Sequence, residues 1–131
     1  MKKFVGFCFI LVCFAALGFS QASTKVYRCI GFINQNNIDS AETIVRVVAQ
    51  HGDPTVYTIY TNDSNSMVIT LRNGRSTPTQ ATWEASVSAS TGARLTGLTA
   101  TTTNKYTGNI LTNTVNLYQG GTRILTLILE G

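Results

Sequence analysis

Hydrophobic and polar residues alternate along most of the chain after residue 22, which is the pattern of β-strands that bury one face. Turn-forming residues recur between these runs at intervals typical of a β-sandwich or a small barrel. We predict about eight strands, mostly connected as a meander: 25–33, 43–49, 55–61, 67–72, 82–88, 94–103, 109–118 and 122–130. The expected fold is therefore all-β, a single antiparallel sandwich or small up-and-down barrel closed by the C-terminal hairpin.

The two C-terminal runs can be given a register. A two-residue Gly-Gly loop would mix polar and apolar side chains on both faces of the hairpin. A three-residue loop at 119–121 would pair Val115 with Leu125 and Leu111 with Leu129, and would gather the leucines on one face. Because a slip of one residue turns every side chain to the other face, the apolar pattern favours the three-residue, bulged form.

The other face of this hairpin carries the most distinctive candidate surface. In the predicted register it holds two isoleucines among hydroxyl and amide side chains: Ile124, Ile128, Thr112, Thr114, Asn116 and Thr126. A strand that is apolar on both sides is either covered on both or offers an apolar stripe to a partner. Both readings stay open, and the second predicts binding to another protein or to a second copy of the chain.

The sequence predicts the local structure of three further segments. Asn73-Gly74 is the strongest short hairpin signal in the chain and predicts a turn. Strict alternation in the first strand places Phe32 with Val26, opposite Tyr27. The segment 40–43 has the residues of a helix N-terminus, but the β-branched run after it favours a strand.

The N-terminus predicts export. Lys2 and Lys3 precede an apolar run over 4–19 and then Ser20-Gln21-Ala22, which together describe a secretory signal peptide cleaved after Ala22. We therefore divide the chain into a signal peptide, 1–22, and an all-β domain, 23–131. The style of the signal indicates a bacterial periplasmic or secreted protein. No stable membrane insertion is expected after cleavage, because the apolar run is shorter than a membrane span.

Cys29 is then the only cysteine left, so no internal disulfide can form in the mature chain. Cys29 is either a small buried hydrophobic residue or an exposed thiol that pairs between chains. The formal net charge of +4 includes the two signal-peptide lysines, and the remaining basic residues are scattered singly. This distribution lacks the clustered footprint of a nucleic-acid-binding protein.

Few groups suit catalysis. The one histidine, His51, stands in a turn beside Asp53, and we interpret it as solvated because no nucleophile motif accompanies it. A hydrolase using His51 or Glu84 is the least favoured function, since Glu84 is expected in solvent and its neighbour Trp83 in the core. No catalytic residue, metal site or cofactor is predicted; the turn at 62–65 supplies oxygen atoms but lacks the spacing of a calcium loop.

Two short motifs resemble periplasmic lysozyme inhibitors. Tyr27-Arg28-Cys29 and the segment 90–94 (Ser-Thr-Gly-Ala-Arg) are similar to the Tyr-x-Cys and Ser-Gly-x-x-Tyr elements of that family. The resemblance implies a loop that inserts into the lysozyme cleft. This chain departs from the pattern, because Leu95 stands where the family has tyrosine and Cys29 has no partner cysteine.

The expected function is therefore non-enzymatic: an exported β domain that binds a protein or a glycan, or associates with itself, through its sheet face. Tyr118 and Tyr106 offer amphipathic rings for such contacts. The alternative is a lysozyme-inhibitor-like protein or a small-ligand barrel that acts through the loops around Ser90 and Arg94 and at 104–108. A deep interior pocket would favour a ligand, and a filled interior would favour recognition at the surface.

Overall fold

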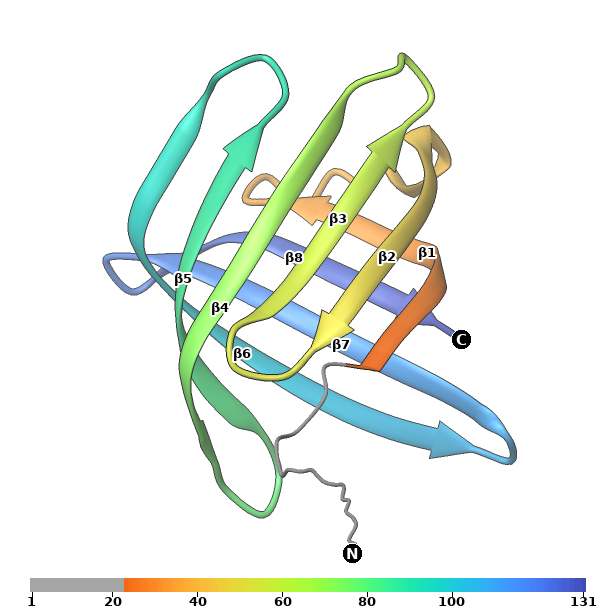
Figure 1. Cartoon of the computed structure of the whole chain (residues 1–131), viewed down its shortest axis with the longest axis vertical. Helices are drawn as coiled ribbons and strands as arrows, with labels where there is room; N and C mark the ends of the chain where they lie inside the picture. The colour runs from red at the N-terminus through yellow and green to blue at the C-terminus, as the bar shows by residue number, and fades with distance from the viewer. Residues whose placement is uncertain (1–22) are drawn as a thin grey trace, which may run out of the picture.

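The structure is a computed structural model that describes residues 23–131. It is a closed barrel of eight antiparallel strands, in which each strand pairs with the next and β8 pairs with β1 (Figure 1). The strands are β1 (Ser23–Asn34), β2 (Ile44–His51), β3 (Thr55–Thr61), β4 (Ser66–Ser76), β5 (Ala81–Ala89), β6 (Arg94–Thr107), β7 (Ile110–Gln119) and β8 (Thr122–Glu130). The predicted all-β meander is confirmed, in its barrel form. The predicted signal peptide, 1–22, lies outside the described residues.

Side chains that alternate along the strands point inward and fill the barrel. The largest fully buried side chains are Val47, Tyr57, Ile59, Ile69, Leu71, Leu98, Val115, Leu117, Leu127 and Leu129. Burying each aliphatic member of this set stabilises the fold by about 1.5–3 kcal/mol relative to leaving it exposed. An eight-stranded barrel is just wide enough for such side chains to meet at its centre, and here they do.

The C-terminal hairpin has the predicted faces but not the predicted turn. Gly120 and Gly121 form a two-residue turn with φ of 59° and 84°, and a β-bulge follows in β8, so that Val115 pairs with Leu127. The prediction of a three-residue loop is therefore wrong. The strands are offset by two residues from the predicted register, and because side chains alternate with a period of two, the leucine face is unchanged.

The same bulge separates the two isoleucines of the predicted stripe. Ile124 is the residue without a cross-strand partner at the bulge, and it packs against the core. Ile128 stays on the outer surface, where it lies across Gly31 of β1; a Cβ on Gly31 would be 2.9 Å from Ile128 Cδ1. The expectation that both isoleucines share the outer face is wrong for Ile124.

Asn73-Gly74 lies inside β4 and not at a hairpin turn. These two residues form a β-bulge with a positive φ at Asn73, and the β4–β5 turn comes after Ser76. A Cβ on Gly74 would lie 2.6 Å from Trp83 Cζ3 of β5. The glycine is therefore required by the indole ring packed beside it, and the predicted turn is wrong for that reason.

Because of a bulge in β1, the side chains after Cys29 point to other faces than regular alternation predicts. The register shifts between Cys29 and Gly31, which turns Phe32 inward to the core side instead of placing it with Val26. Cys29 is half-buried against the core, and its Sγ donates to the carbonyl oxygen of Gly31 at 3.2 Å. Burial raises the pKa of the Cys29 thiol, so the thiolate is disfavoured. Of the two readings for Cys29, the structure fits the partly buried hydrophobic residue.

Candidate functional site

Polar or hollowed surfaces that could act on another molecule lie at both ends of the barrel and on its outside. The β3–β4 and β5–β6 turns lie at the upper end of the barrel in Figure 1, and the β2–β3 and β4–β5 turns lie at the lower end. The lower end holds a buried polar cluster, and the upper end holds a small apolar hollow. The outer surface of the barrel holds a groove and, beside it, a face rich in threonine.

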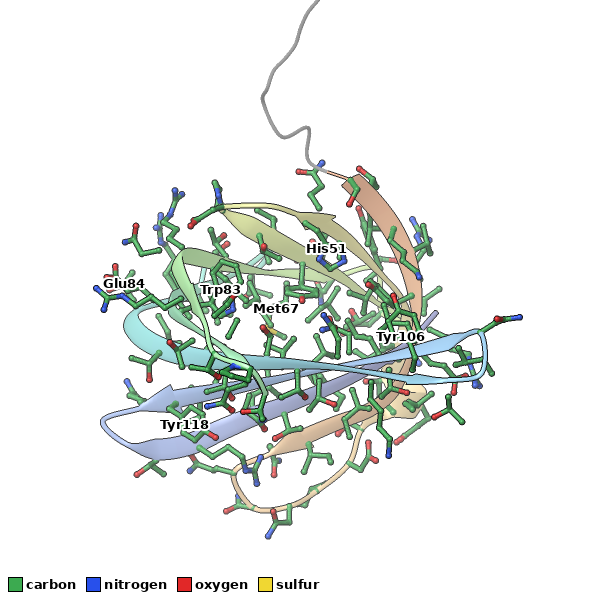
Figure 2. The ribbon with its side chains drawn as sticks, turned by 90° about the horizontal axis from the view of Figure 1, so that it is seen from below. His51, Met67, Trp83, Glu84, Tyr106 and Tyr118 are labelled. Atoms are coloured by element: carbon green, nitrogen blue, oxygen red, sulfur yellow. The ribbon has the colours of Figure 1, made fainter. Side chains whose placement is uncertain are left out.

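The polar cluster at the lower end consists of five side chains, and we call it the polar end cluster: Tyr27, His51, Tyr57, Asn104 and Asn113. Figure 2 looks toward this end, and His51 points inward there. His51 Nε2 lies 2.8 Å from the hydroxyl of Tyr27. The hydroxyl of Tyr57 donates to Asn113 Oδ1 at 2.8 Å, and Asn113 Nδ2 donates to Asn104 Oδ1 at 2.7 Å.

The interpretation of His51 as a solvated turn residue is wrong. His51 is the last residue of β2 and is only half-exposed, because it continues the inward positions of Val47 and Ala49. Burial, reinforced by the nearby Lys25 ammonium group, lowers the pKa of the His51 imidazole. The sequence could have predicted this orientation. Residues 47, 49 and 51 are spaced two apart along one strand, so their side chains point to the same face.

Burial also keeps the tyrosines of this cluster neutral. The pKa of Tyr27 is raised by desolvation and then by the neighbouring Tyr106, and the pKa of Tyr57 is raised by desolvation and then by Tyr27. The cluster is thus an uncharged network at neutral pH whose members bond to one another. Such a network fits a role in closing the end of the core.

The arrangement expected of a Ser–His–Asp site is not formed at His51. The hydrogen-bond partner of the imidazole is the Tyr27 phenol. Asp53, its neighbour in the β2–β3 turn, instead accepts hydrogen bonds from the backbone amides of Asn73, at 3.0 Å, and Gly74, at 3.2 Å. Within residues 23–131, no group of three or more His, Cys, Asp or Glu side chains is placed to hold a metal ion.

A hollowed surface lies on the outside of the barrel, across β4, β5 and β6. It consists of two adjoining open depressions of about 400 and 420 Å³ that share Glu84 and Thr99. We call them together the outer groove. Its outward side chains are Thr70, Arg72, Arg75, Thr82, Glu84, Ser86, Thr99 and Thr101. Hydroxyl groups thus line its length, with two guanidinium groups and one carboxylate among them.

The arginines of the outer groove form no ion pair with its carboxylate, in the part of the chain that the structure describes. Arg72 stands directly opposite Glu84 in the β4–β5 register, yet Glu84 Oε1 accepts a hydrogen bond from Asn73 Nδ2 at 3.0 Å. Within residues 23–131, the one ion pair joins Arg28 and Glu130, on β1 and β8. The guanidinium groups of the groove are therefore available to a bound molecule.

The predicted polar residues of β7 continue this surface. Cross-strand pairing places Tyr118 beside Thr99 and Asn116 beside Thr101. Tyr118 and Glu84 both point away from the barrel in Figure 2. The outward side chains of β7 are Thr112, Thr114, Asn116 and Tyr118, and we call them the β7 face. Four of the residues predicted from sequence are thus brought together, on a surface adjoining the outer groove.

The two predicted loops lie at opposite ends of β6 and cannot form one site. Ser90 is in the β5–β6 turn at the upper end, where its hydroxyl accepts from the Ser66 amide at 3.0 Å. Arg94 begins β6 beside an apolar hollow of about 290 Å³ lined by Met67, Val87, Ala89, Ala93 and Leu95. Tyr106 is near the other end of β6, and is 70% exposed. The two segments are therefore separate surfaces, with the length of β6 between them.

The turn at 62–65 uses its oxygen atoms internally. Asp63 accepts hydrogen bonds from the Thr61 hydroxyl and from the Asn65 amide, the latter at 3.1 Å. These hydrogen bonds, led by that of Thr61, lower the pKa of the Asp63 carboxyl. The turn is explained by its own bonding, without a metal ion.

Comparison with protein-family models, with curated proteins and with solved structures finds no match to this chain. In the part of the chain from 23 to 131, no helix has the length and apolar character needed to cross a membrane. Inference about function therefore has to start from the surfaces described above.

Proposed function

We propose that this protein is an exported, non-enzymatic β-barrel that binds a glycan across the outer groove and the adjoining β7 face. The observation that carries the proposal is the hydroxyl-lined groove on the outside of a barrel whose interior is filled by side chains. A filled interior directs recognition to the surface. The export signal predicted at 1–22 would place the protein among extracellular or periplasmic glycans.

The chemistry of the groove suits a sugar polymer better than a protein interface. Sugar hydroxyls both donate and accept hydrogen bonds, and threonine hydroxyls, guanidinium groups and a carboxylate complement them. The outer groove offers these groups along its length, while its large aliphatic side chains point inward. Tyr118, beside Thr99, adds a ring whose apolar face can cover a sugar ring and whose hydroxyl stays in solvent.

Immobilised soluble polysaccharides test this proposal. Binding of the protein to dextran, xylan, hyaluronan and polygalacturonate is measured by biolayer interferometry at 0.15 M NaCl. Thr101→Val keeps the shape of the side chain but removes its hydroxyl. We expect Thr101→Val to weaken binding to the retained polymer about 2–10-fold, the effect of one hydrogen bond worth about 0.5–1.5 kcal/mol.

Thr58→Val is the matched control, because Thr58 is also a half-exposed threonine but lies on β3, outside the groove. Its binding should equal that of the unmodified protein. Emission from the single tryptophan, Trp83, reports that both variants are folded, since its indole packs against the core. The proposal fails if no polysaccharide is retained, or if the two threonine variants bind alike.

A second candidate function is recognition of a protein by the upper end, as the resemblance to lysozyme inhibitors implies. The observation that favours it is the apolar hollow beside Arg94, with Leu95 44% exposed at its rim. An inhibition assay with lysozyme distinguishes the two functions. Under this candidate the protein inhibits lysozyme and Arg94→Ala abolishes the inhibition, whereas glycan binding predicts that Arg94→Ala leaves polysaccharide binding unchanged.

A further inference from the structure

We infer that the glycan recognised by the outer groove is acidic, and that Arg72 and Arg75 bind its anionic groups. This inference rests on the proposed function and names the class of polymer. The observation behind it is a β-bulge that brings both arginines to the same face of the barrel.

Residues three apart in a regular strand point to opposite faces, because side chains alternate with a period of two. Arg72 and Arg75 are three apart, yet their cross-strand partners are Glu84 and Thr82, which point to the same outer face. The register shift at Asn73-Gly74 accounts for this difference. A bulge that re-aims a side chain in this way is a common device at binding surfaces.

The bulge is held in place by residues from two neighbouring elements, the β2–β3 turn and β5. On one side the Asp53 carboxylate accepts the amides of Asn73 and Gly74, at 3.0 and 3.2 Å. On the other side the Trp83 ring occupies the space where a side chain of residue 74 would begin. The position of both arginines is therefore set by contacts that they do not themselves make.

The nearby carboxylates accept hydrogen bonds from the bulge and form no ion pair with either arginine, among the described residues. Asp53 is bonded to the bulge amides, and Glu84 accepts from the Asn73 side chain. The groove therefore presents two exposed guanidinium groups beside a row of hydroxyls. Guanidinium groups bind carboxylate and sulfate oxygens in a forked geometry, and hydroxyls bind neutral sugar oxygens. A polymer that carries both kinds of group fits this surface.

Two acidic polymers and their neutral counterparts test the inference. Polygalacturonate is compared with its carboxyl-reduced form, and dextran sulfate with dextran, by biolayer interferometry at 0.15 M NaCl. We expect the acidic member of at least one pair to bind at least tenfold more tightly than its neutral member. The pair that shows the difference distinguishes a carboxylate from a sulfate ligand.

Charge-removing variants then locate the effect. Arg72→Gln and Arg75→Gln should each weaken binding to the acidic polymer by up to about fivefold, as expected for exposed arginine–anion pairs, and should weaken binding to the neutral polymer less. Arg46→Gln is the control, because Arg46 is also exposed but stacks on the Tyr60 ring, 4.3 Å from its centroid, on β2. Arg72→Lys should restore part of the lost affinity by restoring the charge.

The possible failures are distinguishable. If acidic and neutral polymers bind equally while Thr101→Val still weakens binding, the acidic preference is wrong and the glycan proposal stands. If all three glutamine variants lose affinity equally, the attraction is unspecific and the inference is wrong. If neither pair, nor xylan or hyaluronan, is retained, the inference fails together with the proposed function.

Discussion

The polar end cluster and the outer groove both consist of polar side chains, but these side chains find their partners in different ways. In the polar end cluster, Tyr57 and Asn113 are buried and bond to each other. In the outer groove, Arg72 and Arg75 are exposed and form no ion pair within residues 23–131. A polar group that is buried must find its partner inside the protein, or the fold loses stability. Polar groups that are satisfied internally stabilise the fold, while those exposed to solvent are available to a ligand.

The largest effect that tests this comparison comes from two asparagines on one strand. Asn113→Ala leaves the buried Tyr57 hydroxyl and the Asn104 amide oxygen without their partner. We expect a loss of about 2–4 kcal/mol in the free energy of unfolding, measured by urea denaturation. Asn116→Ala, three residues along β7 on the outer side, should cost less than about 1 kcal/mol. Equal losses would mean that burial does not distinguish the two regions.

Gly74→Ala tests the contact that links the core to the groove. The added methyl group would meet the Trp83 ring, so we expect a loss of about 1–3 kcal/mol from overpacking. Because the bulge would shift, binding to the acidic polymer should also fall. A second change, Trp83→Leu, removes the obstructing ring, and the double variant should lose less stability than the sum of the two single variants. Strict additivity would contradict this packing argument.

The pH dependence of stability sharpens the comparison further. Because the pKa of His51 is lowered in the folded protein, the unfolded chain takes up a proton first as the pH falls below the ordinary value of 6.5. Stability contributed by neutral His51 is therefore complete above pH 6.5 and is lost as the pH falls toward the folded pKa. The groups that face His51 are Lys25, Tyr27 and Tyr57.

Urea denaturation at pH 7.5 and pH 5.0 measures this effect. The unmodified protein should lose more stability between the two values than His51→Gln, which has no imidazole to protonate. The His51→Gln substitution should leave polysaccharide binding at pH 7.5 unaltered, because the polar end cluster lies outside the groove. An identical pH dependence in both proteins would remove His51 from the account.

The strands could be predicted from the sequence because the alternation of apolar and polar residues depends only on neighbours within the same strand. The eight runs and their meander order follow from residues two apart along each strand, as in Val115, Leu117 and the leucines of β8. The faces of the C-terminal hairpin were predicted even with the wrong turn. A register error of an even number of residues does not change which side chains point inward.

The bulges could not be predicted, and they decide which side chains reach the proposed binding surface. A glycine pair or an Asn-Gly pair can adopt a positive φ. Turns and bulges both use a positive φ, so the sequence pair does not distinguish them. At Asn73-Gly74 the choice depends on Trp83, which lies on the neighbouring strand. Arg72 and Arg75 were therefore not recognised as a pair, since regular alternation sends them to opposite faces. By contrast, the outward orientation of Asn116 was predicted, because the pairing of β7 with β6 is regular.

The most direct test of the central claim is an NMR titration of the isotopically labelled 23–131 chain with an oligosaccharide of the polymer that it binds. The account predicts amide shift changes concentrated at Glu84, Thr99 and Thr101, with Tyr57 and Asn113 unchanged. Shift changes centred instead on the polar end cluster, or on Ser90 and Arg94 at the upper end, would contradict it.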